Sequence, residues 1–123
     1  MPAVFVDATA DAGLDFTHFN GMSGEMYFCE VVGAGAALFD YDDDGDLDAY
    51  LVQGAMLGPD KTLADASFPP RDGADVDDRL YRTELASGSI RFTDVTRDAG
   101  VRSVGYGMGV AAADFDNDGW VDL

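Results

Sequence analysis

Basic residues are scarce in this chain. It has 7 lysine and arginine residues against 24 aspartate and glutamate residues, which gives a formal net charge of −17 at pH 7. Binding to nucleic acid or to an anionic membrane surface depends on clustered Lys and Arg side chains. The composition therefore argues against both kinds of partner.

Cysteine and histidine are also nearly absent. Cys29 is the only cysteine, so the chain forms no disulfide within itself, and we expect a small buried hydrophobe at this position. His18, the only histidine, is expected to be structural, with metal binding or base catalysis as the alternative. The sequence offers no nucleophile–base pair, no catalytic zinc set and no phosphate-binding loop, so we expect no enzymatic activity.

Long apolar runs are missing as well. No segment reaches the ~18 consecutive apolar residues typical of a membrane-spanning helix. Residues 1–5 lack the basic and apolar regions of a signal peptide. We therefore expect either an intracellular chain or one whose export signal has been removed.

Aspartate, in contrast, is abundant and concentrated in two short stretches. Residues 40–48 read DYDDDGDLD, with carboxylates at loop positions 1, 3, 5 and 9 and glycine at position 6. Calcium-binding loops place their oxygen ligands at this spacing, and a backbone carbonyl fills position 7. The predicted ligands are the carboxylates of Asp40, Asp42, Asp44 and Asp48 and the carbonyl of Asp46.

The same pattern returns in residues 114–122, which read DFDNDGWVD. Two like unit charges about 4 Å apart repel by roughly 1 kcal/mol in water, so converging carboxylates favour a bound cation. We predict two Ca²⁺ sites, since Mg²⁺ prefers rigid octahedral sites with several waters; the alternative is a polar turn with hydrated carboxylates. The predicted ligands of the second site are the carboxylates of Asp114, Asp116, Asp118 and Asp122 and the carbonyl of Trp120.

The two loops differ from EF-hands, in which helices flank the loop and an acidic residue stands at position 12. Position 12 of the first loop is Leu51, and the flanking residues are AALF at 36–39 and LDAYLV at 47–52. Short apolar runs bounded by glycine are typical of strands. We therefore predict a β-hairpin whose turn is clamped by calcium.

The acidic loops belong to a longer internal repeat. FVDATADAGL at 5–14 aligns with FTDVTRDAGV at 92–101, and GAGAALFD at 33–40 aligns with GMGVAAAD at 107–114. The two offsets are 87 and 74 residues, so the first copy carries 13 extra residues within 15–32.

The predicted fold is all-β, a fragment of a β-propeller. Four antiparallel strands joined in sequence make one propeller blade, and the sequence between the acidic loops predicts four strands, at residues 35–39, 47–53, 79–85 and 90–96. A proline-rich surface loop is expected at 57–77.

Three segments follow from this assignment. Residues 34–96 would form the full blade. Residues 1–33 would contain the outer strand of a preceding blade, at 5–9, and an inserted segment. Residues 97–123 would begin the following blade, with a strand at 109–113.

These segments resemble FG-GAP (VCBS-type) repeats, the calcium-binding blades of integrin-α-like β-propellers. The similarity to the cartilage-acidic-protein-like (ASPIC/UnbV-associated) subgroup comes from FTHFNG at 16–21, Glu30 and GAG at 33–35. The similarity to the repeat itself comes from FDYDDDGDLD at 39–48, DFDNDGWVD at 114–122, RLYR at 79–82 and RFTDVT at 91–96.

The resemblance implies a seven-bladed, secreted propeller used in adhesion or recognition. The chain would be a calcium-binding repeat module of an extracellular or periplasmic protein, with calcium in a structural role. Its partners would be the remaining blades or other copies of the chain, and its ligand a protein or a carbohydrate. One alternative is part of a propeller enzyme that acts on polysaccharide, with catalytic residues outside residues 1–123; another is a cytosolic calcium buffer.

Glu30 stands in an apolar stretch, CEVV at 29–32. A buried carboxylate requires hydrogen-bond donors, so we expect Glu30 to bind the backbone of the inserted segment, with a place in a ligand site as the alternative. Replacing it by glutamine, an uncharged and weaker acceptor, should lower the melting temperature measured by circular dichroism. An unchanged melting temperature would contradict the structural role.

Overall fold

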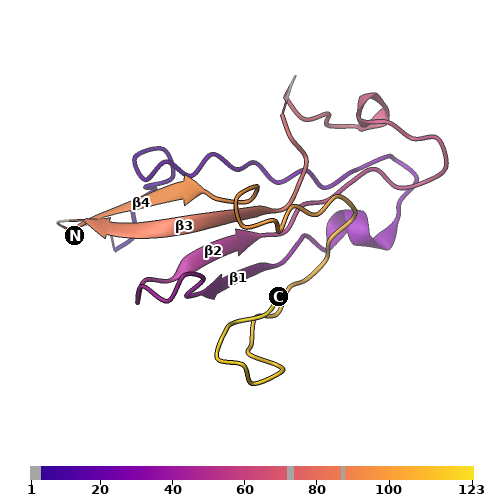
Figure 1. Ribbon diagram of the computed structural model, residues 1–123. Coiled ribbons are helices and arrows are strands. Elements are labelled where there is room, and N and C mark those ends of the chain that lie inside the picture. Colours follow the sequence, from indigo (N-terminus) through magenta and orange to yellow (C-terminus); the bar gives the residue numbers. More distant parts are fainter. Residues whose placement is uncertain (1–3, 72–73, 87) are drawn as a thin grey trace.

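A single four-stranded antiparallel sheet organises the protein (Figure 1). The computed structural model describes residues 4–71, 74–86 and 88–123. The strands follow one another in chain order as β1 (Ala36–Phe39), β2 (Asp48–Leu51), β3 (Arg79–Ala86) and β4 (Ser89–Asp94). The predicted all-β class is confirmed, and the four predicted strands are present with ends shifted by at most two residues.

The first acidic loop joins two strands that pair directly. Phe39 at the end of β1 lies opposite Asp48 at the start of β2, and Ala36 lies opposite Leu51 at the other end of the ladder. The predicted hairpin is therefore correct. β2 also pairs with β3, through Ala49–Tyr81 and Tyr50–Leu80. The first acidic loop therefore lies at one end of the sheet.

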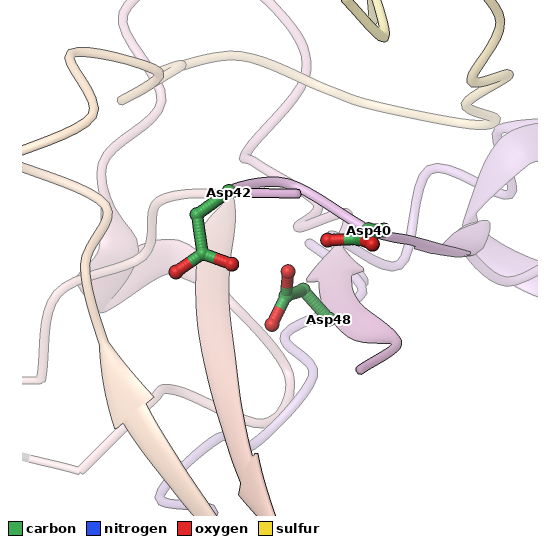
Figure 2. A group of neighbouring side chains, drawn as sticks. All are labelled: Asp40, Asp42 and Asp48. Atoms are coloured by element: carbon green, nitrogen blue, oxygen red, sulfur yellow. The ribbon is translucent and has the colours of Figure 1, made fainter. Parts of the chain in front are cut away.

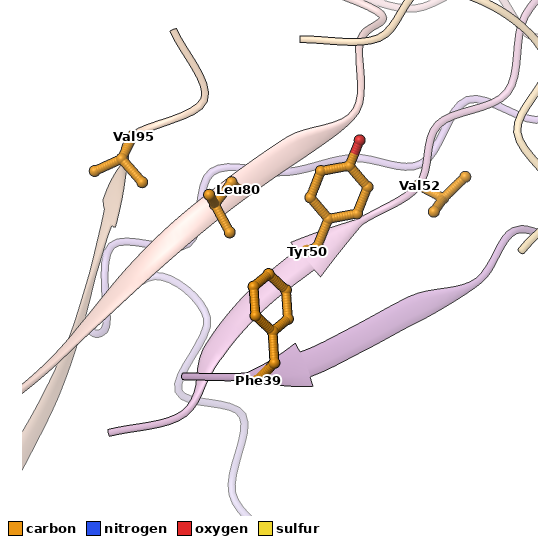
Figure 3. Close-up of a cluster of buried hydrophobic side chains, with 5 residues drawn as sticks. All are labelled: Phe39, Tyr50, Val52, Leu80 and Val95. Carbon is orange, nitrogen blue, oxygen red and sulfur yellow. The ribbon is translucent and has the colours of Figure 1, made fainter. Parts of the chain in front are cut away.

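The hydrophobic core lies on one face of this sheet (Figure 3). Side chains alternate between faces along a strand, and Tyr50 and Leu80 are cross-strand partners that point to the same side. Leu80 is fully buried. The buried cluster consists of Phe39, Tyr50, Val52, Leu80 and Val95.

The second repeat copy covers part of this core. Val110 and Ala112 pack against the cluster, and the Gly107 N–H donates to the Gln53 carbonyl at 3.0 Å. A Cβ on Gly35 would lie only 2.9 Å from the Gly109 Cα. Small residues are thus required where the two backbones approach each other.

Two predicted strands do not form. Residues 5–9 belong to no strand in the described part of the chain, and Phe5 is 90% exposed. Residues 109–113 contribute only an isolated bridge, Ala113 with Asp122. Both corrections have one physical reason: a strand requires a neighbouring ladder, and apart from that one bridge no other strand of the described residues pairs with these two segments.

The remaining segments run as loops around the sheet. The predicted loop at 57–77 contains one short 3-10 helix, η2 (Leu63–Asp65), and residues 72–73 lie outside the description. A second 3-10 helix, η1 (Phe28–Val31), lies in the inserted segment. Residues 1–3 and Ser87 also lie outside the described residues. None of the described helices is long and apolar enough to cross a bilayer.

Three residues singled out by the sequence have clear surroundings. Glu30 is buried, and its Oε1 accepts hydrogen bonds from the Ser23 N–H at 2.9 Å and the Ser23 hydroxyl at 2.5 Å. The structural role expected for Glu30 is therefore supported. His18 is exposed, so the expected structural histidine is not seen, and Cys29 is half-buried rather than buried.

Tyr50 makes a polar contact at the edge of the core. Its hydroxyl donates to Asp78 Oδ2 at 3.0 Å. Burial of the ring, together with the hydrogen bond and the charge of Asp78, raises the pKa of Tyr50 to about 12. Asp78 also accepts the Gln53 N–H at 2.7 Å, so this contact ties β2 to the start of β3.

The Tyr50 contact predicts a pH-dependent stability. Because folding raises its pKa above the unfolded value of about 10, its contribution is complete below pH ~10 and is lost as the pH rises toward 12. We expect the free energy of unfolding of the wild type, relative to Tyr50→Phe, to fall across this range. Urea denaturation of both proteins at a series of pH values measures the difference; a difference that stays constant from pH 8 to 12 would contradict the assignment.

Candidate metal centre

The first acidic loop folds by hydrogen bonds from its own backbone to its own carboxylates. Asp40 accepts the N–H groups of Asp44 at 3.1 Å and Gly45 at 2.9 Å. Gly45 adopts φ +91° and Asp43 φ +59°, a left-handed region that glycine and short polar residues tolerate best. These residues therefore form a tight turn around the Asp40 carboxylate.

Three of these carboxylates converge (Figure 2). Each of Asp40, Asp42 and Asp48 contributes an oxygen, and the three oxygens lie within 4.8 Å of one another. Asp40 and Asp42 come from the loop, whereas Asp48 is the first residue of β2. The strand pairing therefore closes the cluster from the side opposite the loop.

Asp48 is the most constrained member of the cluster. Its side chain is fully buried. One oxygen accepts the Tyr41 N–H at 2.7 Å, and the other accepts the Thr83 N–H, also at 2.7 Å. A buried carboxylate requires such donors, and here they connect the loop entrance to strand β3.

Strand β3 contacts the loop at further points. The Leu85 N–H donates to Asp46 Oδ2 at 3.1 Å, and the Thr83 hydroxyl donates to the Leu47 carbonyl at 2.6 Å. Arg82 places its Nε 4.0 Å from Asp42 Oδ2. Loop, β2 and β3 therefore form one connected unit.

The crowding of carboxylates contributes to a raised pKa of Asp42. Loss of solvent around the side chain raises its pKa, and the negative charges of Asp44, Asp48 and Asp40 raise it further, whereas Arg82 opposes the shift. Like charges disfavour ionisation of a neighbouring acid. A cation among these oxygens would relieve the repulsion.

The second loop reproduces the first. Asp114, Asp116 and Asp122 each offer an oxygen, and these lie within 4.8 Å of one another. Asp122 accepts the Phe115 N–H at 3.0 Å, as Asp48 accepts that of Tyr41. The turn residues match as well: the equivalents of Asp43 and Gly45, which are Asn117 at φ +60° and Gly119 at φ +96°, have nearly the same backbone angles.

The structure brings together six of the ten predicted ligands. Asp44 and Asp118 lie outside the two clusters, and their Oδ1 atoms accept the N–H groups of Asp46 and Trp120, each at 2.9 Å. Asp46 and Trp120 were predicted to bind through their carbonyls, and this part remains a prediction. The sequence analysis missed Thr83 and Arg82, because their place beside the loop depends on the pairing of distant strands.

The donor set determines what the clusters can hold. Both consist of carboxylate oxygens, with no sulfur or imidazole donor among them. Oxygen-only sets suit hard divalent cations. The residues present fit a metal ion at each of the two loops.

Comparisons with known proteins returned no match. No protein-family model matches the chain, and the searches of curated proteins and of solved structures also found no match. The assignment of the two loops therefore depends on their own geometry.

The double role of Asp48 predicts a loss of stability even in chelator-treated protein. In Asp48→Asn one of the two N–H donors would face an amide NH₂ instead of an oxygen, and we expect a loss of about 1.5–3 kcal/mol. Urea denaturation in excess chelator measures it. Asp43→Asn is the matched control, since Asp43 is exposed and asparagine tolerates its positive φ; equal stability of the two variants would contradict the bracing role of Asp48.

Proposed function

We propose that this chain is a calcium-binding repeat module of a β-propeller, in which calcium has a structural role. The observation that carries the proposal is the duplication of one loop geometry. Two loops, 74 residues apart in the sequence, each gather three carboxylates within 4.8 Å and use the same backbone hydrogen bonds.

Calcium is the cation that the loops suit best. Ca²⁺ takes six to eight oxygen ligands in flexible geometry, whereas Mg²⁺ demands a near-ideal octahedron and keeps several waters. Each loop offers three carboxylates together with further acidic side chains and backbone carbonyls nearby. Such a set can complete a calcium shell without a fixed octahedron.

The propeller arrangement is supported by the way in which the second repeat packs on the first. Val110 and Ala112 contact the core face of the sheet. Their counterparts in the first copy are Ala36 and Leu38, which are exposed on the opposite face, Leu38 at 67%.

The first sheet thus contacts Val110 and Ala112 of the second repeat on one face and exposes the equivalent residues of its own repeat, Ala36 and Leu38, on the other. Stacked four-stranded units of this kind would continue in the same direction, each covering the core of its neighbour, as blades do around a propeller. The partners of the exposed face would then be further blades or other copies of the chain. We place such a protein outside the cytoplasm, in recognition or adhesion.

The proposal predicts that calcium stabilises the fold. At about 100 times the dissociation constant, one site bound only by the folded state adds about 2.7 kcal/mol. Melting temperatures should therefore rise with calcium and fall again with chelator, and magnesium at the same concentration should have a smaller effect.

Variants connect this effect to the loops. Asp40→Asn combined with Asp114→Asn should abolish the calcium response, whereas Asp43→Asn should retain it, because Asp43 lies outside the converging carboxylates. A melting temperature that is the same in calcium and in chelator would contradict a structural role of calcium.

A further inference from the structure

A cleft of about 580 Å³ lies at the end of the sheet opposite the first acidic loop. Residues 15–19 (the first wall) and residues 68–71 with 74–76 (the second wall) line it, together with Gln53 and Arg79. Neither acidic loop contributes to its lining. Its volume lies within the range of about 300–1,000 Å³ found for ligand sites.

Both walls are additions to the strand framework. Residues 15–19 open the interval in which the first repeat copy carries 13 extra residues relative to the second. The opposite wall comes from the proline-rich connector between β2 and β3. Loops held on a rigid sheet are where binding residues concentrate, and the repeat architecture itself does not account for either segment.

Buried contacts hold the first wall in place. Gln53, which is buried, accepts the Phe19 N–H at 2.6 Å and donates to the Thr17 carbonyl at 3.1 Å. The Tyr81 hydroxyl donates to the Asp15 carbonyl at 2.8 Å. On the second wall, the partly exposed Asp75 pairs with Arg79 at 3.3 Å. The buried contacts therefore hold the first wall, and a wall held in this way loses little conformational entropy on binding.

The lining differs in charge from the rest of the protein. Acidic residues outnumber basic ones 24 to 7 in the whole chain. Among the described residues of the cleft, in contrast, two carboxylates (Asp15, Asp75) balance two guanidinium groups (Arg71, Arg79). Because these four charges sum to zero, they favour neither sign of ligand, and the overall negative charge of the chain would repel an anion.

Apolar surface accompanies this balanced set. Phe16 and Phe68 line the cleft, and Phe68 is 70% exposed. The exposed imidazole of His18 lies in the same lining. The cleft therefore combines hydrogen-bond donors, acceptors and aromatic rings.

We propose that this cleft binds a neutral saccharide. Sugar hydroxyls both donate and accept hydrogen bonds, so they use guanidinium and carboxylate groups equally, and the C–H face of a sugar ring covers an exposed aromatic ring. The inference does not depend on the metal loops, and it can fail or hold separately from the proposed calcium function.

The test is a titration of the full ¹⁵N-labelled chain in calcium buffer with five trisaccharides. Maltotriose, cellotriose and triacetylchitotriose are neutral, trigalacturonate is anionic and chitotriose is cationic. We expect at least one neutral trisaccharide to give saturable amide shifts in residues 15–19 and at Phe68, and to bind more tightly than both charged ones.

Two variants complete the test. Phe68→Ala should weaken binding about tenfold, which corresponds to about 1.4 kcal/mol, while sheet amide shifts report that the fold is intact. Phe28→Ala, at an exposed phenylalanine of η1 outside both the cleft lining and the acidic loops, should leave binding unchanged. The proposal is overturned if no neutral trisaccharide shifts these signals, if a charged trisaccharide binds best, or if Phe68→Ala binds as tightly as the wild type.

Discussion

The Asp48 carboxylate is the contact on which the arrangement of the sheet and the acidic loop depends. It is fully buried, and its two oxygens accept N–H groups from Tyr41 in the loop and Thr83 in β3. One oxygen of Asp48 lies within 4.8 Å of an oxygen of Asp40 and of an oxygen of Asp42. Two N–H donors stabilise one buried charge, but they do not offset the repulsion among three. A cation at this point would neutralise the cluster and hold the loop, β2 and β3 together.

The second repeat copy makes the same loop contacts as the first and also packs on the first sheet. The second loop uses Asp122 and Phe115 as the first uses Asp48 and Tyr41. Val110 and Ala112, which precede the second loop, pack against the core cluster of the first sheet. In the proposed propeller, each unit would receive the next unit on one face and pack against the previous unit with the other. The cleft lined by residues 15–19, 68–71 and 74–76 lies at the other end of the sheet, where the chain departs from the repeat.

Much of this could be predicted from the sequence, because it is encoded locally. The spacing of Asp40, Asp42 and Asp48 around Gly45 predicted a turn that gathers carboxylates, and short apolar runs predicted the four strands. Contacts between distant residues were out of reach: Thr83 lies 35 residues from Asp48 and reaches it only through strand register. The strand predicted at 5–9 from the repeat was wrong because no strand of the described residues pairs with this segment. The hydrogen bond from the Asp46 N–H to the Asp44 carboxylate is likewise a contact that spacing does not reveal.

The central claim is that the converging carboxylates surround a divalent cation, and a crystal structure grown in millimolar calcium tests it most directly. The account predicts anomalous density between Asp40, Asp42 and Asp48, with oxygens about 2.3–2.6 Å away, and equivalent density between Asp114, Asp116 and Asp122. Water alone at both positions, or carboxylates turned apart into solvent, would contradict it.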